Sequence, residues 1–264
     1  TPIEGTALRA ADIADRTDHC DWNEDQWGVD VKKPGAQEWY DSLFRLLASW
    51  GVDFVKADDL CYRGEEIAML RRAIDRTGRP IVLSLSYGPM PIERAGELAA
   101  HANMWRLLGD LWDYWGQVLP AFRRLHEWTP FAGPGHWPDP DMLPLGRLRA
   151  LPEGWSKAVT MNPGYFEMVS HGGREDVANF LTRDERLTVM TLWTIARAPL
   201  MVGGDLPTSD DWTVRLLTNA EALAVNQSSR ANRQLFHANG LAAWTAVSAD
   251  GTRTYVAVFN AADK

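Results

Sequence analysis

Residues 49–60 of the chain read Ser49-Trp50-Gly51-Val52-Asp53-Phe54-Val55-Lys56-Ala57-Asp58-Asp59-Leu60. The segment predicts a short buried strand over 53–57, entered from a Trp-Gly turn and ending in a Lys-Ala-Asp-Asp cluster. A hydrophobic strand that delivers a lysine and two carboxylates at its C-terminal end has the layout of an active site in a parallel barrel. The same charges could simply be solvated, or one aspartate could cap the next helix. Both interpretations stay open at this point.

The residues around this segment alternate between helix and strand patterns. A helix beginning near Pro34 and a second over 64–77 each show apolar residues at three- and four-residue spacing, so each should bury one face. Residues 81–86 predict a second apolar strand, and strand, helix and strand at this spacing are typical of a parallel βαβ unit. Residues 1–35 are polar and rich in aspartate, and they predict an irregular loop. The face of the first helix that we expect to be buried carries Trp39, Tyr40, Leu43, Phe44, Leu47 and Trp50.

The alternation continues toward the C-terminus and then changes. Residues 147–181 mix proline, glycine and scattered aromatics, and they predict an inserted excursion. After about residue 230, β-rich segments separated by Asn-Gly and Asp-Gly turns predict an antiparallel meander. The further strands expected in the α/β part are 104–108, 134–138 and 199–202; the further helices are about 110–125, 183–197 and 209–218; the meander strands are 234–237, 241–247 and 254–260.

Composition narrows the classes of function. A net charge of −8 argues against a nucleic-acid partner, and the apolar runs are too short to span a membrane. Only Cys20 and Cys61 are present, so the chain is no disulfide scaffold. Most of the 13 tryptophans should pack in the core. Because indole faces also suit sugar rings, the count favours a carbohydrate ligand.

Polar residues gather where the predicted strands end. In a parallel barrel all these ends face one mouth. Two carboxylates held in different environments, one ionised and one protonated, are the means of glycoside hydrolysis. The strand ends therefore favour a glycosidase site. The residues concerned are Lys56, Asp58, Asp59, Ser84, Ser86, Tyr87, Arg106, Asp110, Asp139, Asp141 and Asp205.

Six motifs in a fixed order make the interpretation specific. They are Trp50-Gly-Val-Asp-Phe-Val-Lys-Ala-Asp58, Gly78-Arg-Pro-Ile81, Trp105-Arg-Leu-Leu-Gly-Asp110, Gly133-Pro-Gly-His-Trp-Pro-Asp-Pro-Asp-Met-Leu143, Ala198-Pro-Leu200 and Asn226-Gln227. Over about residues 36–260 the chain resembles glycoside hydrolase family 27, the α-galactosidase (melibiase) family. The resemblance implies an α/β fold: a partial (β/α)8 TIM barrel at 1–229 that lacks its N-terminal strands, then the start of a truncated C-terminal antiparallel β-sandwich domain at 230–264.

The resemblance also implies an activity and residue roles. The protein would be a retaining glycoside hydrolase that cleaves terminal α-galactoside-type linkages by double displacement, with no cofactor and no metal. By motif position, Asp58 is the nucleophile and Asp110 the general acid/base. Lys56, Arg106 and Asp141 match contacts to sugar hydroxyls. Physical reasons agree, because Lys56 lies on the same strand face as Asp58 and would keep it ionised, while partial burial would favour a protonated Asp110.

One departure from the family concerns specificity. The segment that usually reads Cys-Glu-Trp and contacts the sugar 2-position reads Ser86-Tyr87-Gly88 here. The acidic ligand of the 2-hydroxyl is therefore missing, and we expect Ser86 and Tyr87 to bind the substrate differently. N-acetylgalactosamine, or a pentopyranose related to galactose, is the alternative sugar.

Two other classes of function remain open. One is a metal-dependent barrel hydrolase with Asp58, Asp59, Asp139 and Asp141 as oxygen ligands. The other is a non-catalytic carbohydrate-binding relative. The expected partner is an α-galactoside-containing oligosaccharide, polysaccharide or glycoconjugate, with no nucleic acid and no membrane; the sequence predicts no oligomeric state. The family resemblance implies a secreted or periplasmic location.

The ends of the chain suggest an internal fragment. The chain starts at Thr1 with no signal-peptide pattern, and its last predicted strand stops without neighbours. Five strands cannot close an eight-stranded barrel, so we expect one side to expose apolar strand edge and core residues.

Overall fold

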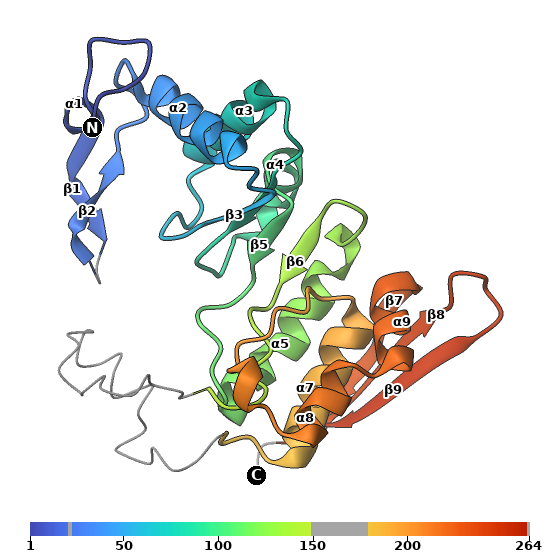
Figure 1. Ribbon diagram of the computed structural model, residues 1–264. Coiled ribbons are helices and arrows are strands. Elements are labelled where there is room, and N and C mark those ends of the chain that lie inside the picture. Colours follow the sequence, from blue (N-terminus) through green and yellow to red (C-terminus); the bar gives the residue numbers. More distant parts are fainter. Residues whose placement is uncertain (21–22, 149–178, 263–264) are drawn as a thin grey trace. The chain divides into compact units, whose positions relative to one another are not determined.

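The computed structural model describes residues 1–20, 23–148 and 179–262 (Figure 1). The chain divides into two compact units, Thr1–Trp105 and Arg106–Lys264. In the described ranges, none of the helices has both the length and the apolar character needed to cross a lipid bilayer. The predicted excursion at 147–181 lies almost wholly outside the described residues.

The first unit is built on parallel strands joined by helices. β3 pairs in parallel with β4, and β4 pairs in parallel with β5. The predicted βαβ units are therefore confirmed. In chain order the elements are α1 (Ala10–Ile13), β1 (Ala14–Cys20), β2 (Asn23–Val29), α2 (Ala36–Ser49), β3 (Phe54–Ala57), α3 (Gly64–Thr77), β4 (Val82–Leu85), η1 (Ile92–Arg94), α4 (Ala95–His101) and β5 (Met104–Arg106).

Helix α3 has the predicted bounds and the predicted buried face. Ile67, Leu70, Ala73 and Ile74 are all at most 5% exposed, because their spacing places them on one side of the helix. The helix ends at Gly78, whose φ of 69° gives the left-handed conformation that stops many helices. This turn leads directly into β4.

Helix α2 buries a narrower face than the sequence predicts. It begins at Ala36 after Gly35, whose φ is 95°, and its buried residues are Ala36, Tyr40 and Phe44. The expected burial of Trp50 is wrong, because this side chain is 69% exposed. The helix packs mainly on α3, and one partner helix covers only the i, i+4, i+8 stripe. The other members of the predicted face lie beside or beyond that stripe.

Strand β3 forms where predicted, but it is not buried. Its residues alternate between exposed and half-buried, and Phe54 is 40% exposed. Among the described residues β3 pairs with β4 alone, so its other edge carries no strand. Among these residues Phe54 therefore lies on the unpaired side of β3, and Lys56 and Asp58 lie at and just beyond the end of the strand.

Residues 1–35 are not the irregular loop that their composition predicts. β1 and β2 form an antiparallel hairpin, with Ala14 opposite Val29 and two irregularities in the register. Ile3 and Ile13 are each 1% exposed and give the segment a small core of its own. Strand pairing satisfies the backbone polar groups, so the polar side chains of the segment are no obstacle to regular structure.

The second unit combines helices with an antiparallel sheet. β7, β8 and β9 pair in order and antiparallel, which confirms the predicted meander. The sheet contacts α5 and α7, with Phe122 and Phe259 edge to face at 5.2 Å and Trp244 fully buried. The elements are α5 (Trp115–Trp128), η2 (Thr129–Phe131), β6 (Trp137–Asp139), α7 (Arg183–Ala196), η4 (Leu206–Thr208), α8 (Asp211–Leu217), α9 (Ala220–Ser228), β7 (Arg230–Ala238), β8 (Leu241–Val247) and β9 (Thr254–Asn260).

One predicted strand of this unit is wrong. Residues 199–202 form only a single parallel bridge, between Leu143 and Val202. Gly203 follows this bridge and packs closely on Met142, since a Cβ at residue 203 would lie 2.2 Å from Met142 Sδ. Strand β6, by contrast, lies beside the residues that follow β5, since Leu107 N donates to Asp139 O at 2.8 Å. The segments that follow β5 and β6 are therefore held together.

Candidate active site

The end of β3 presents Lys56 and Asp58 at the surface. Both side chains are exposed, and within the described ranges neither makes a hydrogen bond or an ion pair. The backbone around Asp58 is fixed, because Ser86 N donates to Ala57 O at 2.9 Å and Leu60 N donates to Ser86 O at 3.0 Å. Asp58 thus lies between two backbone hydrogen bonds to Ser86, the residue that follows β4. The strand end holds the carboxylate in place without covering it.

The end of β4 lies at the same edge of the sheet, because the two strands are parallel. Ser86 and Tyr87 differ sharply in exposure. Ser86 is 1% exposed, and its hydroxyl has no hydrogen-bond partner among the described residues. Tyr87 is 38% exposed. The structure therefore brings Lys56, Asp58, Ser86 and Tyr87 to one edge, with Tyr87 rather than Ser86 at the surface.

In the second unit, Arg106 is the centre of a polar cluster. Its side chain is 2% exposed. Nη2 donates to Gly109 O at 2.6 Å and to Asp110 Oδ1 at 3.3 Å, and Nη1 lies 2.8 Å from Asp141 Oδ1. A planar guanidinium suits this set because it offers several donors in fixed directions. Of the predicted residues, Arg106, Asp110 and Asp141 thus lie together.

The two carboxylates of this cluster have different surroundings. The predicted partial burial of Asp110 is wrong, because its side chain is 51% exposed where the chain follows Gly109 to the surface. The Asp141 side chain is 14% exposed and also accepts from Leu111 N at 2.6 Å. Burial raises the pKa of the Asp141 carboxyl above its ordinary value, although Arg106 and the amides of Leu111 and Met142 oppose the shift. A solvent-accessible carboxyl and a buried one therefore share a single arginine.

Two residues that position Asp141 were not predicted in that role. Asp139 is 7% exposed, and its Oδ1 accepts from Asp141 N at 2.9 Å. Trp193 Nε1 donates to Asp141 O at 3.1 Å. The hydrogen bond of Asp139 is the local Asx turn that an aspartate makes two residues ahead, so the Asp-Pro-Asp spacing carried that signal. Trp193 comes from α7 and gives no signal in the sequence.

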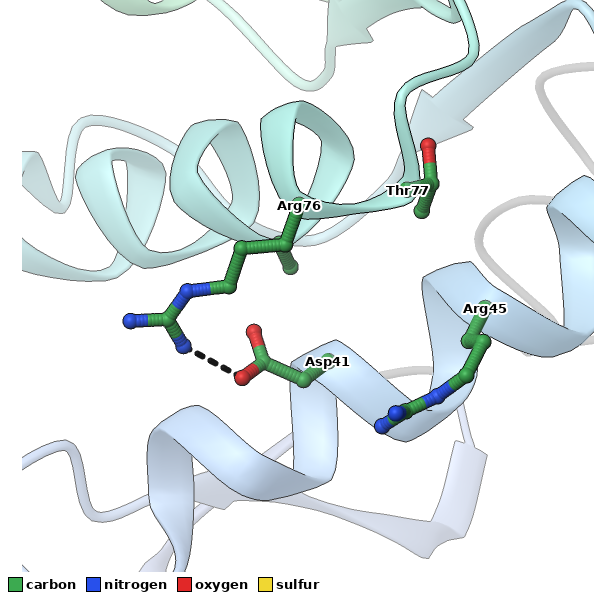
Figure 2. Close-up of a pocket in the computed structure, with 5 residues that line it drawn as sticks. Asp41, Arg45, Arg76 and Thr77 are labelled. Carbon is green, nitrogen blue, oxygen red and sulfur yellow. Dashed lines mark hydrogen bonds and ion pairs between the residues drawn. The ribbon is translucent and has the colours of Figure 1, made fainter.

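A small pocket of the first unit lies away from these strand ends. It is lined by Asp41 and Arg45 of α2 and by Ala73, Arg76 and Thr77 of α3, and Arg76 pairs with Asp41 across it (Figure 2). Helix α3 runs back along the sheet, so its C-terminal residues lie near the start of β4. The pocket is thus at the opposite edge from Asp58, and it offers no second carboxylate for acid–base chemistry.

The described residues also contain no group of three or more histidine, cysteine, aspartate or glutamate side chains that could hold a metal ion. The interpretation of Asp58, Asp59, Asp139 and Asp141 as metal ligands therefore gains no supporting cluster. The roles of the individual site residues stay predictions.

Comparisons with known proteins agree with this geometry. The family model described as Alpha galactosidase A matches residues 27–158. An alpha-galactosidase of Oryza sativa subsp. japonica is 31% identical over 81% of this chain and 45% of its own length. An alpha-N-acetylgalactosaminidase of Gallus gallus is 33% identical over 69% of this chain and 41% of its own length. The chain thus spans about half the length of the curated relatives it matches.

A solved structure extends the comparison to the fold. The GH27-β-L-arabinopyranosidase from Geobacillus stearothermophilus is 45% identical, with a TM-score of 0.86, and the match covers 100% of this chain and 58% of that chain. The parallel strands with their helices are part of a (β/α)8 barrel, and the C-terminal antiparallel strands follow it. The predicted fold class is confirmed.

Proposed function

Because the chain belongs to glycoside hydrolase family 27, the α-galactosidase (melibiase) family, we propose that the protein is a retaining glycosidase. It cleaves terminal α-galactoside-type linkages by double displacement. The observation that carries the proposal is the cluster in which buried Arg106 joins Asp110 and Asp141. In this cluster the family's sugar-binding motifs meet its acid/base motif.

The first step forms a covalent glycosyl-enzyme. Asp58 attacks the anomeric carbon, and the bond to the leaving-group oxygen breaks as Asp110 gives that oxygen its proton. The exposure of Asp58 supports this role, because a nucleophile must reach the substrate. Lys56 lies two residues away on the same strand face.

The second step releases the sugar. Asp110, now ionised, takes a proton from a water molecule, whose oxygen attacks the anomeric carbon and frees Asp58. Arg106 positions Asp110, because its Nη2 lies 3.3 Å from Asp110 Oδ1. Asp110 is half exposed and can exchange protons with water. A retaining mechanism requires the Asp58 and Asp110 carboxyl groups to lie about 5–5.5 Å apart in the working enzyme.

The remaining residues of the site bind the sugar. Lys56, Arg106 and Asp141 contact its hydroxyl groups, and Asp139 orients Asp141 through the backbone. Tyr87 faces the surface and contacts the substrate directly. Ser86 is buried, so we propose that it shapes the position of Tyr87 and of the backbone beside the sugar 2-position.

A second candidate activity has specific support. Tyr87 stands where an acidic ligand is usual, and the solved structure that is 45% identical is a β-L-arabinopyranosidase. Its sugar has the galactose ring without the hydroxymethyl group. A pentopyranosidase or an α-N-acetylgalactosaminidase of the same mechanism is therefore the alternative to a plain α-galactosidase.

A panel of aryl glycosides tests both candidates. The panel contains the α-galactoside, the α-N-acetylgalactosaminide and the β-L-arabinopyranoside with one phenolate leaving group, so only the sugar changes. We expect turnover with at least one of them, and a preference for one of the last two. A preference of a hundredfold or more for the α-galactoside, about 2.7 kcal/mol in transition-state binding, would refute the altered specificity. No turnover of any glycoside would refute the glycosidase.

The proposal also covers the domain organisation, the natural substrate and the location of the protein. We propose that residues 1–229 form the barrel domain and that residues 230–264 belong to a C-terminal β domain, because the antiparallel strands begin at Arg230. The natural substrate is an oligosaccharide, polysaccharide or glycoconjugate with a terminal α-galactoside-type sugar. Family membership favours a secreted or periplasmic location, which cell fractionation would test.

A further inference from the structure

Two of the six sequence motifs have no role in the proposed function, namely Ala198-Pro-Leu200 and Asn226-Gln227. The first motif follows the end of α7, and the second lies in the last turn of α9. These two helices pack on each other (Figure 1). Both belong to the second unit, which also contains the Arg106 cluster.

The ends of α7 and α9 are fixed by each other's side chains. The last carbonyl oxygens of a helix have no donor within the helix and need one from elsewhere. Arg197, the residue after α7, donates from Nε to Asn226 O at 2.9 Å and from Nη2 to Gln227 O at 3.2 Å. In return, Asn226 Nδ2 donates to Trp193 O at 3.3 Å and to Ala198 O at 2.9 Å. The two helix ends therefore hold one another in place.

Arg197 also contacts the strand that leads to Asp141. Its guanidinium lies 5.0 Å from the centroid of the Trp137 ring, and an indole is the aromatic face that a cation prefers. Trp137 is the first residue of β6 and Asp139 is the last. Asp139 Oδ1 accepts from Asp141 N at 2.9 Å. Arg197 thus restrains one end of a short strand whose other end holds the amide of Asp141.

A second connection to Asp141 runs through α7. Trp193 is fully buried, and its Nε1 donates to Asp141 O at 3.1 Å. Its own carbonyl oxygen accepts from Asn226, whose backbone Arg197 holds. The contacts between the helix ends therefore also fix the side chain that binds the carbonyl of Asp141.

The backbone conformation of Asp141 requires this support. Its φ is 86°, in the left-handed region that residues other than glycine rarely adopt. Such a conformation persists only where the surrounding structure fixes it, and here the amide and the carbonyl are held by Asp139 and Trp193. The carboxylate binds Arg106 through Oδ1 and Leu111 N through Oδ2. A change of φ would carry the carboxylate away from these partners.

We propose that Arg197 is a positioning residue that keeps Asp141 in its sugar-binding conformation. It acts through the Trp137 ring on one side and through Asn226 on the other. The inference rests on the proposed function, because that function assigns Asp141 to the hydroxyl groups of the sugar. The Asn226-Gln227 motif then serves the site from a distance, by receiving the guanidinium and by holding the end of α7.

Arg197→Ala tests the role, with Arg79→Ala as the matched control. In the first unit, Arg79 binds two consecutive carbonyl oxygens in the same way, from Nε to Val52 O at 2.9 Å and from Nη2 to Gly51 O at 2.8 Å, and it also pairs with Asp53. Arg79 precedes β4, whereas the site residues follow the strands. A role in stability alone would weaken both variants and change sugar affinity in neither.

Two quantities are measured for each folded variant. One is kcat and KM for the aryl glycoside that the wild type prefers. The other is Kd, by titration calorimetry, for whichever of galactose, N-acetylgalactosamine and L-arabinose the wild type binds most tightly. We expect Arg197→Ala to raise KM and Kd about tenfold and to keep kcat within about threefold, because Asp141 contacts the sugar in the ground state and the transition state alike. Arg79→Ala should leave KM and Kd within about twofold of the wild type.

Arg197→Gly separates the side chain from the backbone. Arg197 itself has a φ of 56°, which glycine adopts without strain. The variant loses the guanidinium but suits the backbone, so it serves even if Arg197→Ala folds poorly. We expect the same rise in KM and Kd as in Arg197→Ala. Wild-type values in Arg197→Gly would overturn the inference.

Binding of the free sugar also separates this inference from the proposed activity. If glycosides are hydrolysed but Arg197→Ala and Arg197→Gly change KM and Kd no more than Arg79→Ala does, the positioning role is overturned and the glycosidase stands. If no glycoside is hydrolysed but the Arg197 variants weaken sugar binding and Arg79→Ala does not, the positioning role stands and the activity is overturned. A wild type that neither hydrolyses a glycoside nor binds a sugar would overturn both.

Discussion

The two halves of the proposed catalytic machinery are built in opposite ways. At the end of β3, Lys56 and Asp58 are exposed, and backbone hydrogen bonds to Ser86, the residue after β4, fix the chain around them. Around Arg106, the side chains themselves form the structure, because a guanidinium that is 2% exposed joins Asp110 and Asp141. The first half should therefore tolerate substitution without loss of stability, whereas the second should lose stability and activity together.

Asp58→Ala should have the largest effect on activity. Without the nucleophile no glycosyl-enzyme can form, so we expect kcat to fall by about 10⁴-fold or more on every substrate, whatever its leaving group. Because the Asp58 side chain is exposed and makes no hydrogen bond among the described residues, the free energy of unfolding should change by less than about 0.5 kcal/mol. Steady-state kinetics and denaturant unfolding measure the two quantities. A large loss of stability would show that β3's end is not the open site described above.

Asp110→Ala should have a smaller effect that depends on the substrate. Loss of the general acid should lower the rate by about 10²–10⁴-fold for substrates with poor leaving groups. Activated phenolates need little protonation, so their first step should survive and the glycosyl-enzyme should accumulate. Azide should then restore turnover, because it attacks without a general base. Equal losses on activated and unactivated substrates, with no azide rescue, would remove Asp110 from the acid/base role.

Arg106→Met, compared with Lys56→Met, tests whether the Arg106 cluster contributes to stability and the exposed end of β3 does not. Removing Arg106 leaves the buried carboxylate of Asp141 without its cation, which should cost about 3–5 kcal/mol of unfolding free energy. Lys56→Met removes an exposed charge and should change stability by less than about 0.5 kcal/mol. Chemical denaturation of both variants gives the comparison. Similar losses of unfolding free energy in the two variants would contradict the predicted difference.

The smallest expected effect is on how the free energy of unfolding depends on pH. Burial raises the pKa of Asp141 above its ordinary value of 3.8, so above pH 3.8 the folded protein binds this proton more tightly than the unfolded chain does. Stability from this group is therefore lost as pH rises from 3.8 to the raised pKa. Wild-type stability should fall over this window relative to Asp141→Asn, by at most about 1.4 kcal/mol per pH unit. Unfolding curves from pH 4 upward measure the difference. A wild type that gains stability with rising pH relative to the variant would reverse the sign.

What the sequence could predict depended on local signals. Helix α3, strands β8 and β9 and the ends of β3 and β4 follow apolar periodicity and turn residues, so their bounds were predicted closely. The β1–β2 hairpin was missed because its side chains are polar, and its stability comes from pairing and from Ile3 and Ile13. Helix α9 has no buried residue and hence no apolar stripe to detect.

In the candidate site, too, the features with local sequence signals were predicted and those that depend on distant contacts were not. Lys56, Asp58, Arg106, Asp110 and Asp141 were predicted because they follow strands within sequence motifs. The buried state of Ser86 was not predictable, because it depends on what packs over the end of β4. Contacts between distant segments, such as the hydrogen bond from Trp193 to Asp141 O and the ion pair of Asp18 with Arg63, leave no local pattern.

Covalent trapping tests the central claim, attack by Asp58, most directly. A fluorinated glycosyl fluoride of the preferred sugar slows both steps but has an activated leaving group, so the glycosyl-enzyme should accumulate. Digestion and tandem mass spectrometry then locate the attached sugar. The account predicts a single adduct on the carboxylate of Asp58, absent from Asp58→Ala and still present in Asp110→Ala. An adduct on another carboxylate, or turnover of the reagent with inversion and no adduct, would contradict it.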